Sequence, residues 1–142
     1  MPSNIGSTPT VPLLGPKLWR ARGDLPRAAA EFLASIWSWT DGYTRENYEL
    51  ARASLELGRP SEAVYPLQSA LRGDLQSSNL YITRTELHEL LARAFEAMGQ
   101  RDSAVAHWRA VETAWRRADP NVRQRWEHAR DAAAQPAGGH QT

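Results

Sequence analysis

Apolar residues recur along most of the chain at spacings of three and four, which is the period of an amphipathic α-helix. The pattern predicts an all-α fold. The helices expected from it span residues 17–22, 26–39, 44–57, 61–72, 84–98, 102–117 and 120–134. The last of these carries a single apolar stripe, so we expect it to cover the end of the domain as a capping helix. That stripe consists of Val122, Trp126, Ala129 and Ala133.

The two ends of the chain differ in composition from the part between them. Residues 1–16 contain four prolines and two glycines, which disfavour a regular helix, and we expect an extended arm or linker there. Residues 135–142 are small and polar and are expected to form a flexible tail. The expected organisation is therefore an arm, one helical domain over residues 17–134, and a tail.

Two local signals support the expected helix starts. Thr83 and Glu86 have the spacing of a capping box, in which each residue satisfies a backbone donor of the other. Asp119 followed by Pro120 is a favourable start, because proline is tolerated in the first helical turn.

Other positions in the turns and helices carry further expectations. Ser61 and Ser103 stand near helix starts, and we expect their hydroxyls to cap backbone donors. Pro66 lies within the helix expected at 61–72 and has no N–H to donate. It predicts a bend or a late start of that helix.

Three segments share one pattern, in which an alanine follows a glycine by five residues and a bulky apolar residue follows the alanine by four. The members are Gly23, Ala28 and Phe32; Gly58, Ala63 and Leu67; and Gly99, Ala104 and Trp108. Glycine accepts the left-handed backbone that ends a helix, and the small alanine lets the next helix pack closely. The glycines are 35 and 41 residues apart.

This pattern resembles the tetratricopeptide repeat, whose period is about 34 residues, over roughly residues 17–118. The second unit matches at Leu50, Ala51, Gly58, Ala63, Leu67 and Ala70, and the third at Leu91, Ala92, Phe95, Gly99, Ala104, Trp108 and Val111. The first unit matches only at Gly23, Ala28 and Phe32. Asn47 and His88 stand where the family has its signature aromatic residue, and the closing proline is missing from both units. The resemblance implies a short superhelical stack of about three helical hairpins with a C-terminal capping helix.

The same resemblance implies a non-catalytic protein-protein interaction module, a scaffold or adaptor. In the family the ligand lies in a groove lined by the first helix of each repeat. By register, that groove would hold Lys17, Arg20, Arg45, Tyr48, Arg52, Glu56, Glu89, Arg93 and Glu96. Its arginines could bind an acidic peptide through charge-assisted hydrogen bonds. Arg52 and Arg93 stand where the family's clamp for C-terminal carboxylates has asparagine, so that ligand is not expected.

The short repeat count leaves two arrangements open. Exposed end faces favour a self-associating adaptor, that is, a homo-oligomer. A truncated first repeat also fits the C-terminal part of a larger bacterial protein. Residues 79–88 and the helices after them resemble C-terminal repeats of bacterial signalling and regulatory proteins.

Composition narrows the alternatives. The formal net charge is +1, which gives no overall attraction to nucleic acid or anionic membrane, and no apolar run reaches the roughly 18 residues of a membrane helix. The N-terminus does not have the pattern of a secretory signal, and a cytoplasmic protein is expected. The chain has no cysteine, which excludes disulfides, thiol catalysis and cysteine-ligated metal.

Candidate chemistry is sparse in this sequence. The four histidines are His88, His107, His128 and His140, and no pair has the i, i+4 spacing that places two imidazoles on one helical face. We therefore expect no metal. The glycines are isolated, serine occurs mostly at turns, and we expect no cofactor and no enzyme.

Tryptophan spacing indicates packing more than ligand binding. Trp108, Trp115 and Trp126 are expected to share a core, since the first two are seven residues apart. Trp37 and Trp39 point in different directions on a helix, so one of them is expected to remain available to a partner.

An arginine-rich segment supports the alternative function, a nucleic-acid-binding helical module. Between Arg101 and Arg130 there are seven arginines against four acidic residues, a net charge of +3. Interleaved acids and the lack of a known reading motif make this the weaker hypothesis.

Overall fold

The computed structural model describes residues 14–35, 43–73 and 82–136, and all regular structure in those residues is helical. The helices are α1 (Leu14–Ala21), α2 (Leu25–Ser35), α3 (Tyr43–Glu56), α4 (Pro60–Arg72), α5 (Arg84–Ala97), α6 (Arg101–Trp115) and α7 (Arg123–Ala133), with the 3-10 turn η1 (Pro120–Val122) before α7. The expected all-α class is confirmed for this part of the chain. The order and approximate bounds of the helices also follow the hydrophobic period.

Three tight corners join α1 to α2, α3 to α4 and α5 to α6. Each corner contains a glycine in the left-handed conformation, with φ of +79° at Gly23 and +72° at both Gly58 and Gly99. The corner at Gly99 is closed by the amide of Gln100, which donates to the carbonyl of Phe95 at 2.8 Å. At the Gly58 corner the amide of Arg59 donates in the same way to the carbonyl of Ser54. These bonds satisfy carbonyls that a helix end leaves free.

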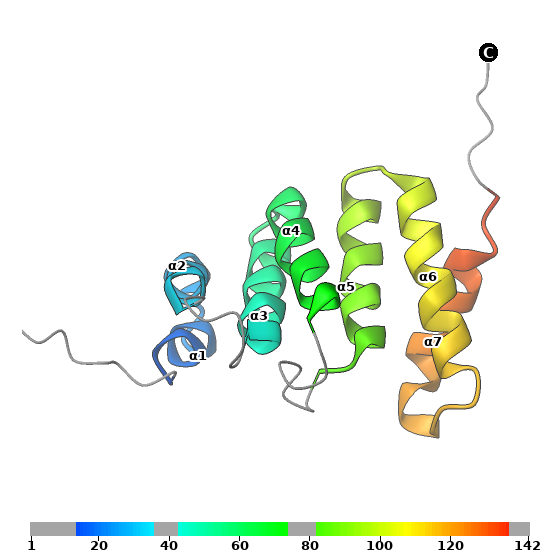
Figure 1. Ribbon diagram of the computed structural model, residues 1–142, viewed down its shortest axis with the longest axis horizontal. Coiled ribbons are helices and arrows are strands. Elements are labelled where there is room, and N and C mark those ends of the chain that lie inside the picture. Colours follow the sequence, from blue (N-terminus) through cyan, green and yellow to red (C-terminus); the bar gives the residue numbers. More distant parts are fainter. Residues whose placement is uncertain (1–13, 36–42, 74–81, 137–142) are drawn as a thin grey trace, which may run out of the picture.

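The helices form an extended row in which each packs against the next, from α1 and α2 at one end to α6 and α7 at the other (Figure 1). Helices joined by a glycine corner run antiparallel, as α5 and α6 show most clearly (Figure 1). In addition, α3 contacts α5 directly, although α4 lies between them in the sequence.

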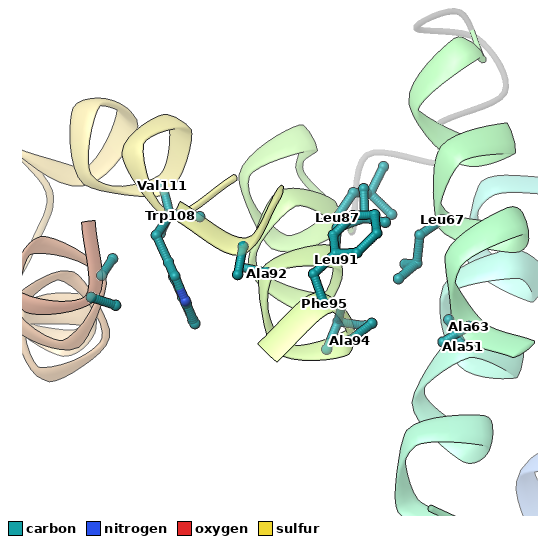
Figure 2. Packing of buried hydrophobic residues seen from close by; sticks show 14 of the residues in the cluster. Ala51, Ala63, Leu67, Leu87, Leu91, Ala92, Ala94, Phe95, Trp108 and Val111 are labelled. Atoms are coloured by element: carbon teal, nitrogen blue, oxygen red, sulfur yellow. The ribbon is translucent and has the colours of Figure 1, made fainter. Parts of the chain in front are cut away.

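The main core is built around α5, whose side chains lie between those of α4 and α6 (Figure 2). Leu67 of α4, Leu91 of α5 and Trp108 of α6 are among its fully buried members. Alanines occupy the close approaches between the helices: Ala51, Ala63, Ala92 and Ala104 are all buried. A smaller cluster contains Ala28, Phe32 and Leu50 and joins α2 to α3.

The last helix covers the core with a slightly different face from the one expected. Its buried residues are Ala129 and Ala132, whereas Ala133 is only partly covered and Val122 lies in η1. Trp126 is also only partly buried, and its Nε1 donates to the carbonyl of Glu112 at 3.2 Å. Of the three tryptophans expected to share a core, Trp108 is buried and Trp115 packs against the cluster.

The chain ends differ in part from the expected boundaries. Helix α1 begins at Leu14, so residues 14–16 belong to the helix and not to the arm. Pro16 is accommodated there because it lies in the first turn, where backbone N–H groups have no helical partner. Residues 1–13 of the arm, residues 36–39 with Trp37 and Trp39, and residues 137–142 of the tail lie outside the described residues.

The capping box is confirmed. The hydroxyl of Thr83 accepts from the amide of Glu86 at 3.2 Å, and the carboxylate of Glu86 accepts from the amide of Thr83 at 2.8 Å. The start at Pro120 is also observed, but it begins the short turn η1, and the Asp119 side chain makes no capping bond.

The late start expected for helix α4 is not observed, because the helix begins at Pro60 and continues through Pro66 to Arg72. The alternative, a bend at Pro66, stays a prediction. Pro66 is buried there, so packing against the core compensates for the missing backbone bond. Ser61 and Ser103 do not cap: both lie inside helices, and Arg59 and Gln100, which hold the cap positions, make no side-chain capping bond.

Replacement of Gly58 tests the dependence of the fold on these corners. No atom lies within 4 Å of the position a Cβ would take, so the cost of Gly58→Ala is backbone strain alone. We expect the free energy of unfolding to fall by about 1 kcal/mol, measured by chemical denaturation. Gly73→Ala is the matched control, because Gly73 has a φ of −64° that alanine adopts freely. Equal losses in the two variants would contradict the strain argument.

Candidate functional site

Side chains of four helices, α1, α3, α5 and α7, meet on what we call the odd-helix face. Helices α3 and α5 contact each other directly. Arg20 of α1 forms ion pairs with Glu49 and Glu56 of α3. Arg125 of α7 forms an ion pair with Glu89 of α5. Side chains that are far apart in the sequence thus meet on one surface.

The N-terminal half of the odd-helix face is a network of alternating charges. Arg20 lies between the carboxylates of Glu49 and Glu56, and Arg52 lies 3.4 Å from Glu49 through its Nη1. The guanidinium of Arg52 also lies over the ring of Tyr48, 5.7 Å from its centroid. Four of the residues expected in the groove are therefore brought together here, namely Arg20, Tyr48, Arg52 and Glu56.

Tyr48 connects this network to the core. Its ring packs against the main cluster. Burial raises the pKa of the Tyr48 hydroxyl, and the nearby carboxylates of Glu86, Glu49 and Glu89 act in the same direction, against Arg52. The hydroxyl therefore remains protonated and available as a hydrogen-bond donor at neutral pH.

Glu89 is the centre of the other half of the face. Its side chain is only 6% exposed, yet it accepts from two arginines: Arg93 Nη2 lies 2.8 Å from Oε1, and Arg125 Nε lies 3.1 Å from Oε2. A buried carboxylate requires such partners, since its loss of water contacts is otherwise uncompensated. The hydrogen bond to Glu89 raises the pKa of Arg125. Arg125 also lies over Trp115, 4.4 Å from the ring centroid.

Arg125 is a residue that sequence reasoning did not place on this face. Helix α7 was expected only to cover the end of the domain, and its arginines were considered for nucleic acid alone. The signal is present in the sequence, however, because Arg125 precedes the buried Ala129 by one helical turn and so points to the same side of α7.

The remaining expected groove residues lie in separate environments. Lys17 is exposed on α1, and Arg45 forms an ion pair with its neighbour Glu46, which is buried. Glu96 accepts a hydrogen bond from a residue of α6: Trp108 Nε1 donates to Glu96 Oε1 at 2.7 Å. That bond supplies the polar partner that a buried indole needs, and it fixes Trp108 in the core.

His88 of α5 and His107 of α6 meet although they are 19 residues apart. Their Nδ1 atoms are 2.8 Å apart and their ring centroids 5.1 Å apart. The ring of Phe95 stacks on His107, with the planes 6° from parallel. Burial lowers the pKa of both imidazoles; Arg84 adds to the effect on His88, and His88 adds to the effect on His107. A search for two histidines on one helix misses this pair, because the two belong to neighbouring helices.

The other two histidines are His128 and His140. His128 lies edge-on to Trp108, 4.8 Å between ring centroids, and His140 lies outside the described residues. Within residues 14–35, 43–73 and 82–136, no group of three or more histidine, aspartate or glutamate side chains is arranged to hold a metal ion.

A small cavity of about 70 Å³ lies where α6 ends and α7 begins. Its walls include Trp115, Arg116, Asp119, Arg123 and Trp126. Aromatic and basic side chains of the arginine-rich segment thus line it together.

No protein family, curated protein or solved structure compared with this chain matches it. Among the helices of the described residues, none combines the length and the apolar content needed to cross a lipid bilayer.

Substitution of Glu89 tests its role in joining α5 to α7. Glu89→Gln keeps the size of the side chain but removes the charge that holds two arginines, and we expect a loss of about 2 kcal/mol in the free energy of unfolding. Glu112→Gln is the control, because the Arg116 partner of Glu112 is exposed on the same helix, and its effect should be much smaller. Comparable losses would show that Glu89 makes no special contribution.

The histidine pair predicts a dependence of stability on pH. Both folded-state pKa values lie below the ordinary value of 6.5, so the unfolded chain takes up protons first as the pH falls. The stabilisation is fully present above pH 6.5 and is lost as the pH falls toward the folded-state pKa values. Chemical denaturation at pH 7.5, 6.5 and 5.5 measures this decline, and it should be shallower in the His88→Gln/His107→Gln double variant. An unchanged slope would contradict the assignment.

Proposed function

We propose that the chain is a protein-interaction module of the tetratricopeptide type, which binds an acidic peptide segment of its partner on the odd-helix face. The observation that carries the proposal is the arrangement around Glu89, where two arginines from different helices share one buried carboxylate. Both guanidinium groups remain partly exposed beside this carboxylate, so an anionic ligand can bind the two of them at once.

The contacts between alternate helices support the repeat type. A stack of helical hairpins places the first helix of each hairpin beside the first helix of the next. The contact of α3 with α5, and the ion pairs of α1 with α3 and of α5 with α7, are what such a stack requires. The left-handed glycines at all three corners support it as well.

The accessible arginine side chains of the odd-helix face favour an acidic ligand over a basic one. Arg93 and Arg125 remain partly exposed, with 54% and 38% of their side chains accessible, so each keeps donors that face solvent. Arginine binds carboxylates with paired hydrogen bonds, which gives geometric specificity as well as affinity. Lys17, exposed on α1, extends the basic character toward the other end of the face.

Peptide binding by two arginine variants tests the proposal. The probes are a labelled peptide rich in glutamate and aspartate and the same peptide with its acids replaced by the neutral amides, each measured by fluorescence anisotropy. We expect the acidic peptide alone to bind, and Arg93→Ala/Arg125→Ala to weaken it at least about tenfold, since charge-assisted hydrogen bonds contribute about 1.5–3 kcal/mol each.

The matched control is Arg109→Ala, which removes an exposed arginine on α6, outside the odd-helix face. Circular dichroism establishes that each variant is folded. Equal weakening by the control would mean that general charge, and not this face, binds the peptide, and lack of binding by the wild type would remove the acidic ligand from the proposal.

Nucleic acid is the second candidate, supported by the aromatic and basic walls of the cavity between α6 and α7. Six of the seven arginines of this segment are exposed, all except Arg125. Binding to random-sequence DNA that is strong at low salt and falls steeply with added salt would favour this function over peptide binding. Arg117→Ala/Arg123→Ala should then abolish it without affecting the acidic peptide.

A further inference from the structure

We propose, on the basis of the function given above, that the Tyr48 hydroxyl donates a hydrogen bond to a main-chain carbonyl of the bound peptide. The odd-helix face then binds the backbone of its ligand as well as the acidic side chains. Three features of Tyr48 support this role: its position among the helices, the lack of a partner for its hydroxyl among the described residues, and the charges around it.

Tyr48 lies where three helices of the odd-helix face come together. It belongs to α3, the carboxylates of Glu86 and Glu89 on α5 act on its hydroxyl, and the hydroxyl in turn acts on Arg125 of α7. Its ring packs against the main core cluster, and the Arg52 guanidinium lies over that ring, 5.7 Å from the centroid. These contacts hold the ring in place. A peptide bound by Arg125 therefore lies near the hydroxyl.

The hydroxyl of Tyr48 is a hydrogen-bond donor without an acceptor. Among residues 14–35, 43–73 and 82–136 no group forms a hydrogen bond with it. The carboxylates around it already have other partners: Glu89 accepts from two arginines, Glu49 from an arginine of its own helix, and Glu86 from the capping box. A half-buried donor that lacks an acceptor costs free energy, because the water contacts that it loses are not replaced. A ligand can supply the missing acceptor.

The charges near Tyr48 favour a neutral acceptor over a carboxylate. Glu86 is held by uncharged groups, the amide and the hydroxyl of Thr83, so its negative charge repels an acidic group placed at the Tyr48 hydroxyl. A main-chain carbonyl is a strong acceptor and carries no net charge. A peptide in an extended conformation offers such carbonyls, because none of them is used within a helix. Its acidic side chains bind to Arg93 and Arg125.

Replacement of Tyr48 by phenylalanine tests the proposal, because Tyr48→Phe removes only the hydroxyl. We expect the affinity for the acidic peptide, measured by fluorescence anisotropy, to fall about three- to tenfold, which is the effect of one neutral hydrogen bond. This loss should be the same at low and moderate salt, since the acceptor is uncharged. The loss in Arg93→Ala/Arg125→Ala should instead shrink as salt is added.

Stability separates a ligand contact from a structural role. The free energy of unfolding of Tyr48→Phe should not fall, because the ring still packs against the core and the hydroxyl has no partner among the described residues. The matched control is Tyr65→Phe, which removes the hydroxyl of a tyrosine of α4 that is 67% exposed and lies outside the odd-helix face. Its peptide affinity should equal that of the wild type.

Three results would overturn the proposal. Wild-type affinity in Tyr48→Phe, together with weakened binding in the arginine variant, removes the hydroxyl contact and leaves the proposed function in place. A loss in Tyr48→Phe that shrinks with salt as the arginine loss does would assign the hydroxyl to an acidic group. A loss of affinity matched by a loss of stability would make the hydroxyl a structural group. Failure of the folded wild type to bind the acidic peptide would instead remove the proposed function, and this contact with it.

Discussion

The close approach of neighbouring helices at buried alanines is the constraint on which the rest of the structure depends. Ala51, Ala63, Ala92 and Ala104 are all inaccessible or nearly so, and each lies where two helices meet. A larger side chain at such a contact would force the helices apart, because protein interiors have no free volume to absorb it. The left-handed glycines act together with these alanines, since they reverse the chain within three residues and set the second helix against the first.

The charges of the odd-helix face are a consequence of that close packing. Helices that are near one another bring Arg125 to Glu89, which Arg93 of the same helix already contacts, and bring Arg20 between Glu49 and Glu56. Such ion pairs stabilise the structure only modestly, because desolvation offsets the attraction. The position of these ion pairs on one face says more about the proposed binding surface than their contribution to stability does. The arginines stay partly exposed and are already oriented by their protein partners, so the proposed binding of an acidic peptide would cost less side-chain entropy.

The same packing gives two tryptophans the same kind of hydrogen bond, from the indole N–H to a glutamate on the neighbouring helix. Trp19 donates to Glu31 at 2.8 Å and Trp108 donates to Glu96 at 2.7 Å, in each case across a hairpin and over 12 residues. An indole buried against a neighbouring helix needs a hydrogen-bond acceptor, and a glutamate on the other helix supplies it. Glu96, one of the acids expected to face a ligand, thus has a structural partner within the fold.

What the sequence by itself determined is the local structure. The helical period located the helices, the glycines at 23, 58 and 99 located the corners, and Thr83 with Glu86 located one helix start, because each of these signals acts over a few neighbouring residues. Where local signals compete, the prediction was wrong in part: Pro66 was expected to bend α4 or delay its start, and the helix starts at Pro60 and is continuous through the buried proline. Only the tertiary structure decided which charges share a carboxylate, that Arg125 belongs with α5, and that His88 meets His107. Those contacts depend on how one helix is rotated and set against another, and no spacing along the chain contains that information.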